Sequence, residues 1–367
     1  MKFSLPENDR RSTWIKLGFI AILIRIIFGI FPELCETLYS RGVYPWIRYF
    51  FDKITNSLPF AGVYIFVLIF IVWLLAKMIS LFISVFVRRE GFKGKGYVFS
   101  FLSFCSMATF WFLLLWGYNY ARVPMSEQIG LEVPENMDFE AVWEEAQFIK
   151  NKCIEARNEI PFIDTHAIEK NDYPENNEDE MRLLLEEVLK EYGYDVSGNV
   201  RGRIIRPEGI LLRFSSSGVY FPFTGEGHVD KGLHAITKPF TLAHEMGHGY
   251  GFGNEAVCNF LAYLSCIRSD DPAIRYSGYL MYWRYVYGAL MEFMTEEDYL
   301  KERATISRGM YNDIEAIYEA QDKFPPFIPY LQPAVYDVFL KVQGIQDGIQ
   351  SYNRMVILVS SWRKKFE

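Results

Sequence analysis

The residues best suited to chemistry lie within residues 241–260, TLAHEMGHGYGFGNEAVCNF. His244, Glu245 and His248 form the pattern HExxH there. Positions i and i+4 of a helix share a face, so both imidazoles can bind one metal ion. Glu245 would then take a proton from a water molecule bound to that ion. Because the chain has only 5 histidines, the pattern is a specific signal for a zinc site with Glu245 as its general base.

Glu255 is the candidate for the third ligand. On a straight helix it would lie roughly 10 Å beyond His248 along the axis, which is too far for a zinc bond of about 2 Å. Residues 249–253 contain three glycines, and glycine permits the turn that would bring the chain back. Asn254 would then cap a second helix with Glu255 in its first turn. Asn259, four residues later on that helix, would orient a metal ligand without binding the metal itself. Two histidines, a glutamate and a water make an open, catalytic set.

Other residues could contribute to this site. His228, Asp230 and His234 precede the helix and compete as ligands, although each is more often a surface or hydrogen-bonded residue. Residues 220–229 could supply an edge strand to which a peptide adds, or could form an ordinary loop. A zinc hydrolase also needs a donor to the oxyanion, and with 24 tyrosines no single one is favoured. Three tyrosines are candidates for this donor: Tyr220, Tyr276 and Tyr279.

Charged and apolar residues are distributed unevenly along the chain. Hydrophobic residues make up 50% of the sequence and aromatic residues 17%. Residues 1–122 carry a net charge of +8, whereas the remainder carries −15. This composition excludes a disordered chain, a small disulfide scaffold and a protein that binds nucleic acid through a basic surface. The 5 cysteines include no CxxC pair, so we expect buried thiols.

Three apolar stretches explain the composition of the first part. Residues 60–87 contain one charge and residues 97–118 contain none. About 20 apolar residues cross the core of a bilayer, so both stretches predict transmembrane helices. Residues 14–31 are a weaker candidate because they include Lys16 and Arg25. Lys16 can reach the membrane surface, whereas Arg25 lies deep and should face other helices.

The flanking charges predict the orientation of these helices. A cleaved signal peptide is the alternative to a retained first span, but no small-x-small site follows Ile30. The N-terminal arm and the loop after the second span hold 8 Lys and Arg residues, against 4 on the other side. Cytoplasmic loops carry the excess of such residues, so the C-terminal domain is expected outside an inner cell membrane, with a cytoplasmic domain as the alternative.

The rest of the chain reads as a linker followed by one domain. We expect residues 1–122 to form the transmembrane region, 123–138 a linker and 139–367 a mainly helical α+β domain of zincin-like fold. Short runs of β-forming residues predict strands at 200–205, 209–214 and 219–223. Helical spacing recurs in seven segments: 139–158, 181–192, 240–250, 254–268, 272–294, 296–321 and 335–361.

The arrangement resembles a family of uncharacterised multi-pass bacterial membrane proteins that end in a gluzincin-like zinc metallopeptidase domain and are known only as a domain of unknown function. Besides HEMGH, the segments that carry the resemblance are LYSRGVYP (38–45), WGYNYAR (116–122), FPFTGE (221–226), YSGY (276–279) and SYN (351–353). The resemblance implies zinc ligands at His244, His248 and Glu255, with Glu245 catalytic. Family members tend to carry Glu-x-Glu-Ala-Asn after the glycine turn, whereas here Val257 replaces the second glutamate. The spacing favours the retained first glutamate as the ligand.

These observations together lead to one expected function and two alternatives. The expected function is a membrane-anchored zinc metalloendopeptidase, with the lipid bilayer and a protein or peptide substrate as partners and no nucleic acid. The first alternative is a membrane-bound sensor or binding protein that retains the fold as a non-catalytic metal module. The intact Glu245 argues against it, since a structural site needs no general base. A transporter is disfavoured because three spans make a thin permeation path.

Overall fold

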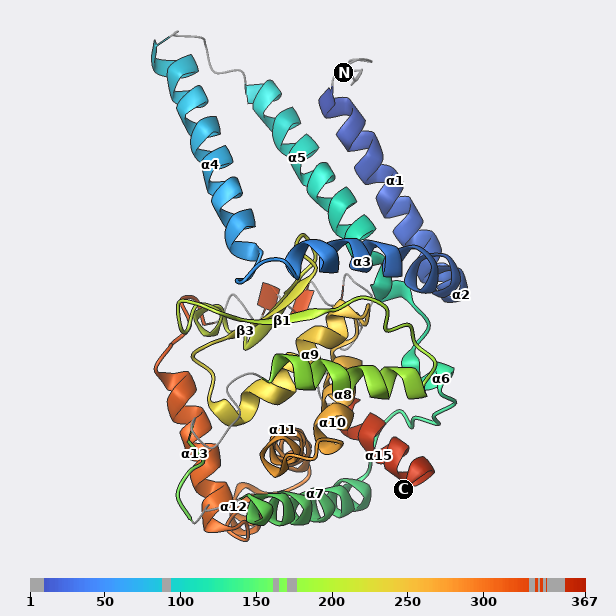
Figure 1. Cartoon of the computed structure of the whole chain (residues 1–367), viewed down its shortest axis with the longest axis vertical. Coiled ribbons are helices and arrows are strands. Elements are labelled where there is room, and N and C mark those ends of the chain that lie inside the picture. The colour runs from blue at the N-terminus through green and yellow to red at the C-terminus, as the bar shows by residue number, and fades with distance from the viewer. Residues whose placement is uncertain are drawn as a thin grey trace.

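The computed structural model describes residues 10–87, 94–160, 165–169, 177–329, 334–335, 337–338, 341 and 354–367. This part of the chain is mostly helical and has two regions (Figure 1). Three long helices project together from one end, and a larger body of shorter helices with one small sheet lies beneath them. The first described residue, Arg10, begins α1, one of the long helices, and the C-terminus lies on the body.

The projecting helices are α1 (Arg10–Ile30), α4 (Val63–Phe82) and α5 (Gly94–Leu115). Each is long and apolar enough to cross a membrane, as the sequence predicted. Helices α1 and α5 pack closely, since a Cβ on Gly18 would lie only 2.7 Å from the carbonyl oxygen of Ser106. Arg25, expected to face other helices, is half-buried. No residue of α4 is buried.

A group of helices that the sequence did not predict connects α1 to α4. It comprises α2 (Pro32–Cys35), the π-helix η1 (Glu36–Val43) and α3 (Tyr44–Thr55). Figure 1 shows α3 lying across the base of the projecting helices, between them and the body. A 3₁₀ helix, η3 (Gly117–Ala121), follows α5. The π-helix η2 (Ile83–Val87) extends α4.

The sheet has three strands in the order β1-β3-β2. Strand β3 (Glu226–Asp230) is central, with β1 (Arg201–Ile205) parallel to it and β2 (Gly218–Phe221) antiparallel on the edge. Residues 220–229 therefore contribute to both an edge strand and the central strand. The strand predicted at 209–214 is wrong, because this segment turns through the 3₁₀ helix η5 (Leu212–Phe214).

Asp230 explains why residues 209–214 do not form a strand. Its carboxylate accepts hydrogen bonds from the backbone N–H groups of Gly209 and Leu211, both at 2.7 Å, and from Leu212 at 3.3 Å. These backbone groups are therefore bonded to a side chain instead of to a neighbouring strand. The β-forming residues of the segment indicated a strand only because this long-range partner is invisible in the local sequence.

The helices of the body surround one hydrophobic core. They are α6 (Met125–Gln128), α7 (Phe139–Glu159), α8 (Glu178–Glu191), α9 (Lys238–Gly249), α10 (Glu255–Ile267), α11 (Pro272–Leu290), α12 (Glu296–Arg303), α13 (Arg308–Asp322) and α15 (Arg354–Phe366). The helix predicted at 296–321 is two helices, because Ser307 caps α13 by accepting from the N–H of Met310. Most of the residues before 354 in the helix predicted at 335–361 lie outside the described residues. The predicted linker packs on the core through Val123, Met125 and Leu131.

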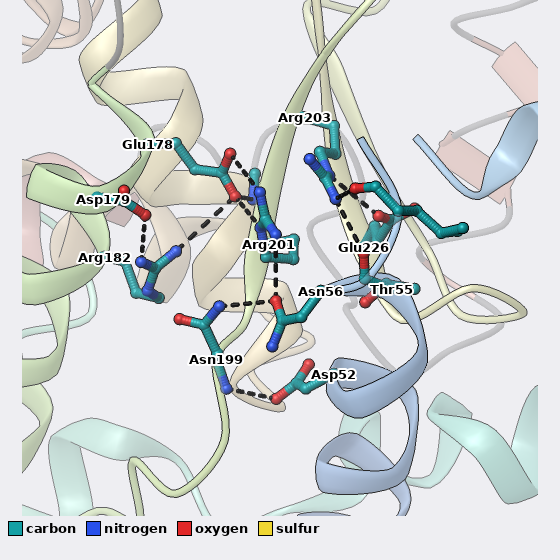
Figure 2. A network of polar contacts seen from close by, with 12 residues as sticks. Asp52, Thr55, Asn56, Glu178, Asp179, Arg182, Asn199, Arg201, Arg203 and Glu226 are labelled. Carbon is teal, nitrogen blue, oxygen red and sulfur yellow. Dashed lines mark hydrogen bonds and ion pairs between the residues drawn. The ribbon is translucent and has the colours of Figure 1, made fainter. Parts of the chain in front are cut away.

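A network of polar contacts joins the α3 region to the sheet (Figure 2). Arg203 of β1 donates to the carbonyls of Thr55 and Leu58 at 3.0 and 2.8 Å, and to Glu226 at 3.2 Å. The other carboxylate oxygen of Glu226 accepts from the backbone N–H of Gly62 at 2.6 Å. Both Arg203 and Glu226 are thus hydrogen-bonded to the chain between α3 and α4, so this segment is held against the body.

Asp52 in the same network predicts a pH-dependent stability. It is buried and accepts from the N–H of Asn199 at 2.7 Å. Burial raises its pKa to about 6, although the Asn199 hydrogen bond partly opposes this. A protein with such an acid loses folding stability as the pH rises from about 4, the pKa of the acid in the unfolded chain, to about 6, its pKa in the folded protein. The free energy of unfolding of Asp52→Asn, measured relative to wild type, should therefore rise by about 2–3 kcal/mol between pH 4 and pH values above 6.

Thermal unfolding of both proteins in the same detergent between pH 4 and 7 measures this difference. Exposed Asp270→Asn, in the turn between α10 and α11, is the matched control and should follow wild type throughout. Parallel pH profiles for wild type and Asp52→Asn would show that the buried Asp52 carboxylate does not cost stability.

Candidate metal centre

Helix α9 presents His244 and His248 on one face. Every residue from Pro239 to Gly249 is buried, so the helix runs through the core and both side chains are held by packing. The two Nε2 atoms lie 3.1 Å apart. The i, i+4 spacing of the motif therefore places two imidazole nitrogens at one point, as the sequence predicted.

The chain turns sharply after α9 and returns with Glu255. Helix α9 ends at Gly249, and Gly251 has a φ of 88°, which a residue with a Cβ rarely adopts. Asn254 caps α10 by accepting from the N–H of Val257 at 3.2 Å, as predicted. Glu255 is the first residue of α10, and its Oε2 lies 3.1 Å from Nε2 of His244 and 3.5 Å from Nε2 of His248.

These three atoms have the spacing that a metal ion requires. Four ligands placed tetrahedrally about 2.0–2.1 Å from zinc lie about 3.3 Å from one another. The observed separations of 3.1, 3.1 and 3.5 Å fall around that value. Within the described residues, His244, His248 and Glu255 are the group of His, Cys, Asp and Glu side chains close enough to hold an ion.

The hydrogen bonds behind the imidazoles make the cluster electron-rich. Nδ1 of His248 lies 2.8 Å from the carbonyl oxygen of Phe252, so this nitrogen carries the proton and donates it. Nδ1 of His244 lies 2.7 Å from Oδ1 of Asn259 and donates in the same way. In the neutral rings both Nε2 atoms then direct lone pairs at each other and at the Glu255 carboxylate. Such an arrangement is stabilised by a cation. In the metal-free protein this cation is a proton, because burial alone would lower the pKa of His248 but Cys258 and Glu255 raise it well above its usual value. A zinc ion fits the same three ligand atoms.

The two glutamates of the site differ in their acidity. Burial alone would raise the pKa of Glu255, but the His248 and His244 imidazoles hold that pKa well below its usual range. Burial raises the pKa of Glu245 above its usual value, although the same histidines partly oppose this. Glu255 therefore remains an ionised ligand, whereas Glu245 can accept and release a proton more readily.

Glu245 lies beneath the strand pair β2–β3. A Cβ on Gly218 of β2 would lie 2.5 Å from Oε1 of Glu245, and a Cβ on Gly227 of β3 would lie 2.7 Å from its Cβ. Only glycine allows the two strands to approach the helix this closely. The Oε2 atom of Glu245 is buried and has no hydrogen-bond partner among the residues that the structure describes. An orphaned carboxylate oxygen beside a candidate metal cluster is available to a water molecule or a substrate.

The other candidate ligands lie outside the cluster. The Nδ1 atom of His228 is 3.3 Å from the carbonyl oxygen of Val219, and Asp230 binds backbone N–H groups. His234 accepts from the N–H of Ile236 at 3.4 Å, and burial lowers its pKa to about 4. None of the three belongs to the His–His–Glu group found among the described residues.

Within the described part of the chain, the candidate tyrosines make their hydrogen bonds and ring contacts to residues other than the three of the cluster. Tyr276 donates to Asp313 at 2.7 Å in the interior of the body. Tyr220 pairs with Tyr44, their hydroxyl oxygens 3.3 Å apart. Tyr279 packs against Tyr263 with ring centroids 6.2 Å apart. The structure therefore gives no reason to favour any of the three as the donor to an oxyanion.

Three side chains from α3 and from the segment after α5 hold the end of α9, and the sequence alone does not indicate any of them. Trp116 donates to the carbonyl of His248 at 2.8 Å, Tyr44 to that of Gly249 at 2.7 Å, and Arg122 to that of Gly251 at 2.8 Å. The last carbonyls of a helix lack partners within it, so these donors satisfy groups that would otherwise be orphaned. The only available signal was that these residues fall in the segments LYSRGVYP and WGYNYAR.

The contact between Asn259 and His244 yields a prediction about metal affinity. Asn259→Ala removes the acceptor that fixes the ring orientation of His244, and changes of this kind weaken metal binding about 10- to 100-fold. Asn259→Asp is the matched control, because it keeps an acceptor oxygen and should retain the affinity. Competition with a chromogenic zinc chelator measures both variants. Wild-type affinity in Asn259→Ala would show that Asn259 does not position the ligand.

The described residues define a class of protein, namely a mostly helical chain with three membrane-length apolar helices and a buried His–His–Glu cluster. Residues 39–360 match the family described as Protein of unknown function (DUF3810). Since the match covers most of the chain, the protein belongs to this family. No curated protein and no solved structure matches the chain. The function must therefore be argued from the site itself.

Proposed function

We propose that the protein is a membrane-anchored zinc metallopeptidase in which His244, His248 and Glu255 bind one zinc ion per chain. The observation that carries the proposal is the convergence of two imidazole nitrogens and a carboxylate oxygen, 3.1–3.5 Å apart, next to the buried Glu245. The sequence pattern, HExxH followed by a glutamate on a second helix, is that of a gluzincin. A zincin-like fold for residues 139–367 is part of this proposal.

The proposed reaction is the hydrolysis of a peptide bond. Bound zinc would acidify a coordinated water molecule and polarise the carbonyl of the scissile bond. Glu245 accepts the proton of the attacking water on its unpartnered Oε2 and then delivers it to the leaving nitrogen. Asn259 and the Phe252 carbonyl hold the two imidazoles in the tautomer that binds a cation. Strand β2 lies at an edge of the sheet and its Gly218 approaches Glu245, so an extended substrate would add to this edge.

The location of the site suggests where its substrates lie. The end of α9 is hydrogen-bonded to Trp116, which follows α5, and to Tyr44, the first residue of α3. Helix α3 lies directly beneath the projecting helices (Figure 1). We propose that α1, α4 and α5 span the inner cell membrane and that the body lies on its outer side, as the Lys and Arg distribution favours. Under this proposal the substrate is a membrane or cell-envelope protein.

A peptidase assay on the full-length protein in detergent tests the proposal. The protein should cleave an unfolded protein substrate or a mixed quenched-fluorescent peptide library after zinc loading. A chelator should abolish this activity, and added zinc should restore it. Zinc-loaded protein that binds the metal and cleaves none of the substrates would favour a non-catalytic role.

One observation favours the alternative of a sensor or binding protein with a non-catalytic metal module. The side chains of His244, His248 and Glu255 are only 10%, 8% and 4% exposed, so a substrate reaches them only if the surrounding structure opens. Hydrogen exchange with and without zinc, together with the peptidase assay, distinguishes the two functions. A sensor would show a large change in exchange in the α9–α10 region and no peptide cleavage, whereas a peptidase would cleave peptides.

A further inference from the structure

Helix α3 buries its polar face and exposes its apolar face, which is the reverse of an ordinary surface helix. Its buried side chains are mostly polar and recur at helical spacing: Tyr44, Arg48, Asp52 and Thr55. Its exposed side chains are mostly large and apolar: Trp46 at 75%, Phe50 at 62%, Ile54 at 47% and Tyr49 at 44%. A helix that packs on a body from water would bury the apolar set, so another apolar medium covers this face.

The polar face of α3 cannot be exchanged for the apolar one, because it is bonded to the body at several points. Tyr44 donates to the carbonyl of Gly249, and Arg48 donates to the carbonyl of Ser197 and to Asp195. Asp52 accepts from the N–H of Asn199. Rolling the helix to bury its apolar residues would leave these buried charged groups without partners, at a cost of several kcal/mol. The exposed apolar face is therefore a fixed feature of the fold.

The position of α3 indicates what covers this face. Helix α3 lies across the base of the three membrane-length helices (Figure 1). Exposed apolar side chains also occur on both sides of α3, with Leu38 54% exposed before it and Phe60 44% exposed after it. The apolar face of α3 therefore lies at the base of the helices proposed to cross the membrane, among further exposed apolar residues.

The residue types on the exposed face are those found at a membrane surface. Trp46 and Tyr49 combine an apolar ring with a polar atom, and such residues concentrate at the level of the lipid headgroups. Lys53 is exposed, with its Nζ 5.3 Å from the centre of the Tyr49 ring, where it can reach an anionic headgroup. Amphipathic helices with this composition lie in the plane of the interface.

We propose that α3 is an interfacial helix whose face formed by Trp46, Tyr49, Phe50 and Ile54 lies in the lipid headgroup and upper acyl-chain region. The occupant of this surface is the bilayer itself, not a second protein. Because Tyr44 on the opposite face bonds the end of α9, helix α3 would lie between the bilayer and the helix that carries His244 and His248. This inference goes beyond the proposed peptidase function and does not depend on it.

Site-directed fluorescence in nanodiscs tests the proposal. Of the 5 cysteines, only Cys105 is not buried, so Cys105→Ala gives a background with poorly reactive thiols. Trp46→Cys is labelled with an environment-sensitive fluorophore and quenched by lipids spin-labelled near the headgroup or near the chain end. Val72→Cys, at 58% exposure in the middle of α4, and Leu183→Cys, at 58% exposure on α8, are matched controls for deep lipid and for water.

The expected result is strong quenching at position 46 by headgroup-labelled lipid and weaker quenching by chain-end-labelled lipid. Position 72 should show the reverse order, and position 183 should show no quenching. Phe50→Cys, on the same face, repeats the test in case the first substitution disturbs the fold. Positions 46 and 50 behaving like 183 would overturn the proposal. Energy transfer between labels on two chains without lipid quenching would also overturn it, because a second copy would then cover the face.

Discussion

Glu245→Gln is expected to abolish peptide hydrolysis while leaving metal binding intact. Glutamine has nearly the same shape as glutamate but cannot accept the proton of the attacking water, and loss of a general base costs about 10²- to 10⁴-fold in rate. Glu245 is not among the three residues whose donor atoms converge, so the variant should still bind one zinc ion. Peptidase assays at equal zinc occupancy, with wild type measured in parallel, give the comparison.

The control for this variant is Glu297→Gln on α12, whose side chain is 79% exposed and should tolerate the change without effect. Glu245→Gln that retains wild-type activity would contradict the proposed role of Glu245. Glu245→Gln that loses zinc would show instead that Glu245 helps to bind the metal. The active-site variant with zinc bound would also serve to trap substrates from membrane extracts.

Glu255→Ala is expected to lose tightly bound zinc. The substitution removes the carboxylate oxygen that lies 3.1 and 3.5 Å from the two imidazole nitrogens, leaving only two protein ligands where a catalytic zinc site uses three. The variant should still fold, because removal of this carboxylate leaves the Asn254 cap of α10 in place. Zinc analysis after dialysis against a weak chelator, together with a thermal melt, measures both properties.

Val257 provides a second arm of this experiment. It lies two positions after Glu255 on α10, which is more than half a turn around the helix, so a glutamate there points elsewhere. Glu255→Ala/Val257→Glu should therefore remain without zinc. Recovery of zinc binding in the double variant would mean that the second glutamate of the Glu-x-Glu pattern, and not Glu255, is the ligand position.

The sequence contains most of the information for the candidate site because its parts are local. The spacing of His244 and His248 fixes their common face, and the glycines and Asn254 predict the turn that returns Glu255. The structure has this turn, with Gly251 at a φ of 88° and the Asn254 cap in place. Asn259, four residues after Glu255 on the same helix, is predicted to orient a ligand, and in the structure it contacts His244.

The features that the sequence did not reveal depend on distant partners. Helix α3 is not predicted from the sequence, because its exposed apolar side and buried polar side make sense only when its surroundings are known. The donors Trp116 and Tyr44 are aromatic residues among many, and nothing local indicates that they bond the end of α9. The wrong strand prediction at 209–214 has the same cause, since the Asp230 side chain that accepts from its backbone N–H groups lies 18–21 residues away.

The measurement that most directly tests the central claim is the metal content and coordination of the wild-type protein, purified in detergent with zinc supplied during expression. The account predicts one zinc ion per chain, with an X-ray absorption spectrum showing two imidazole nitrogens and oxygen ligands at about 2.0–2.1 Å. A correctly folded wild-type protein that contains no zinc and binds none when titrated would contradict the account, and His244, His248 and Glu255 would then form only a hydrogen-bonded cluster.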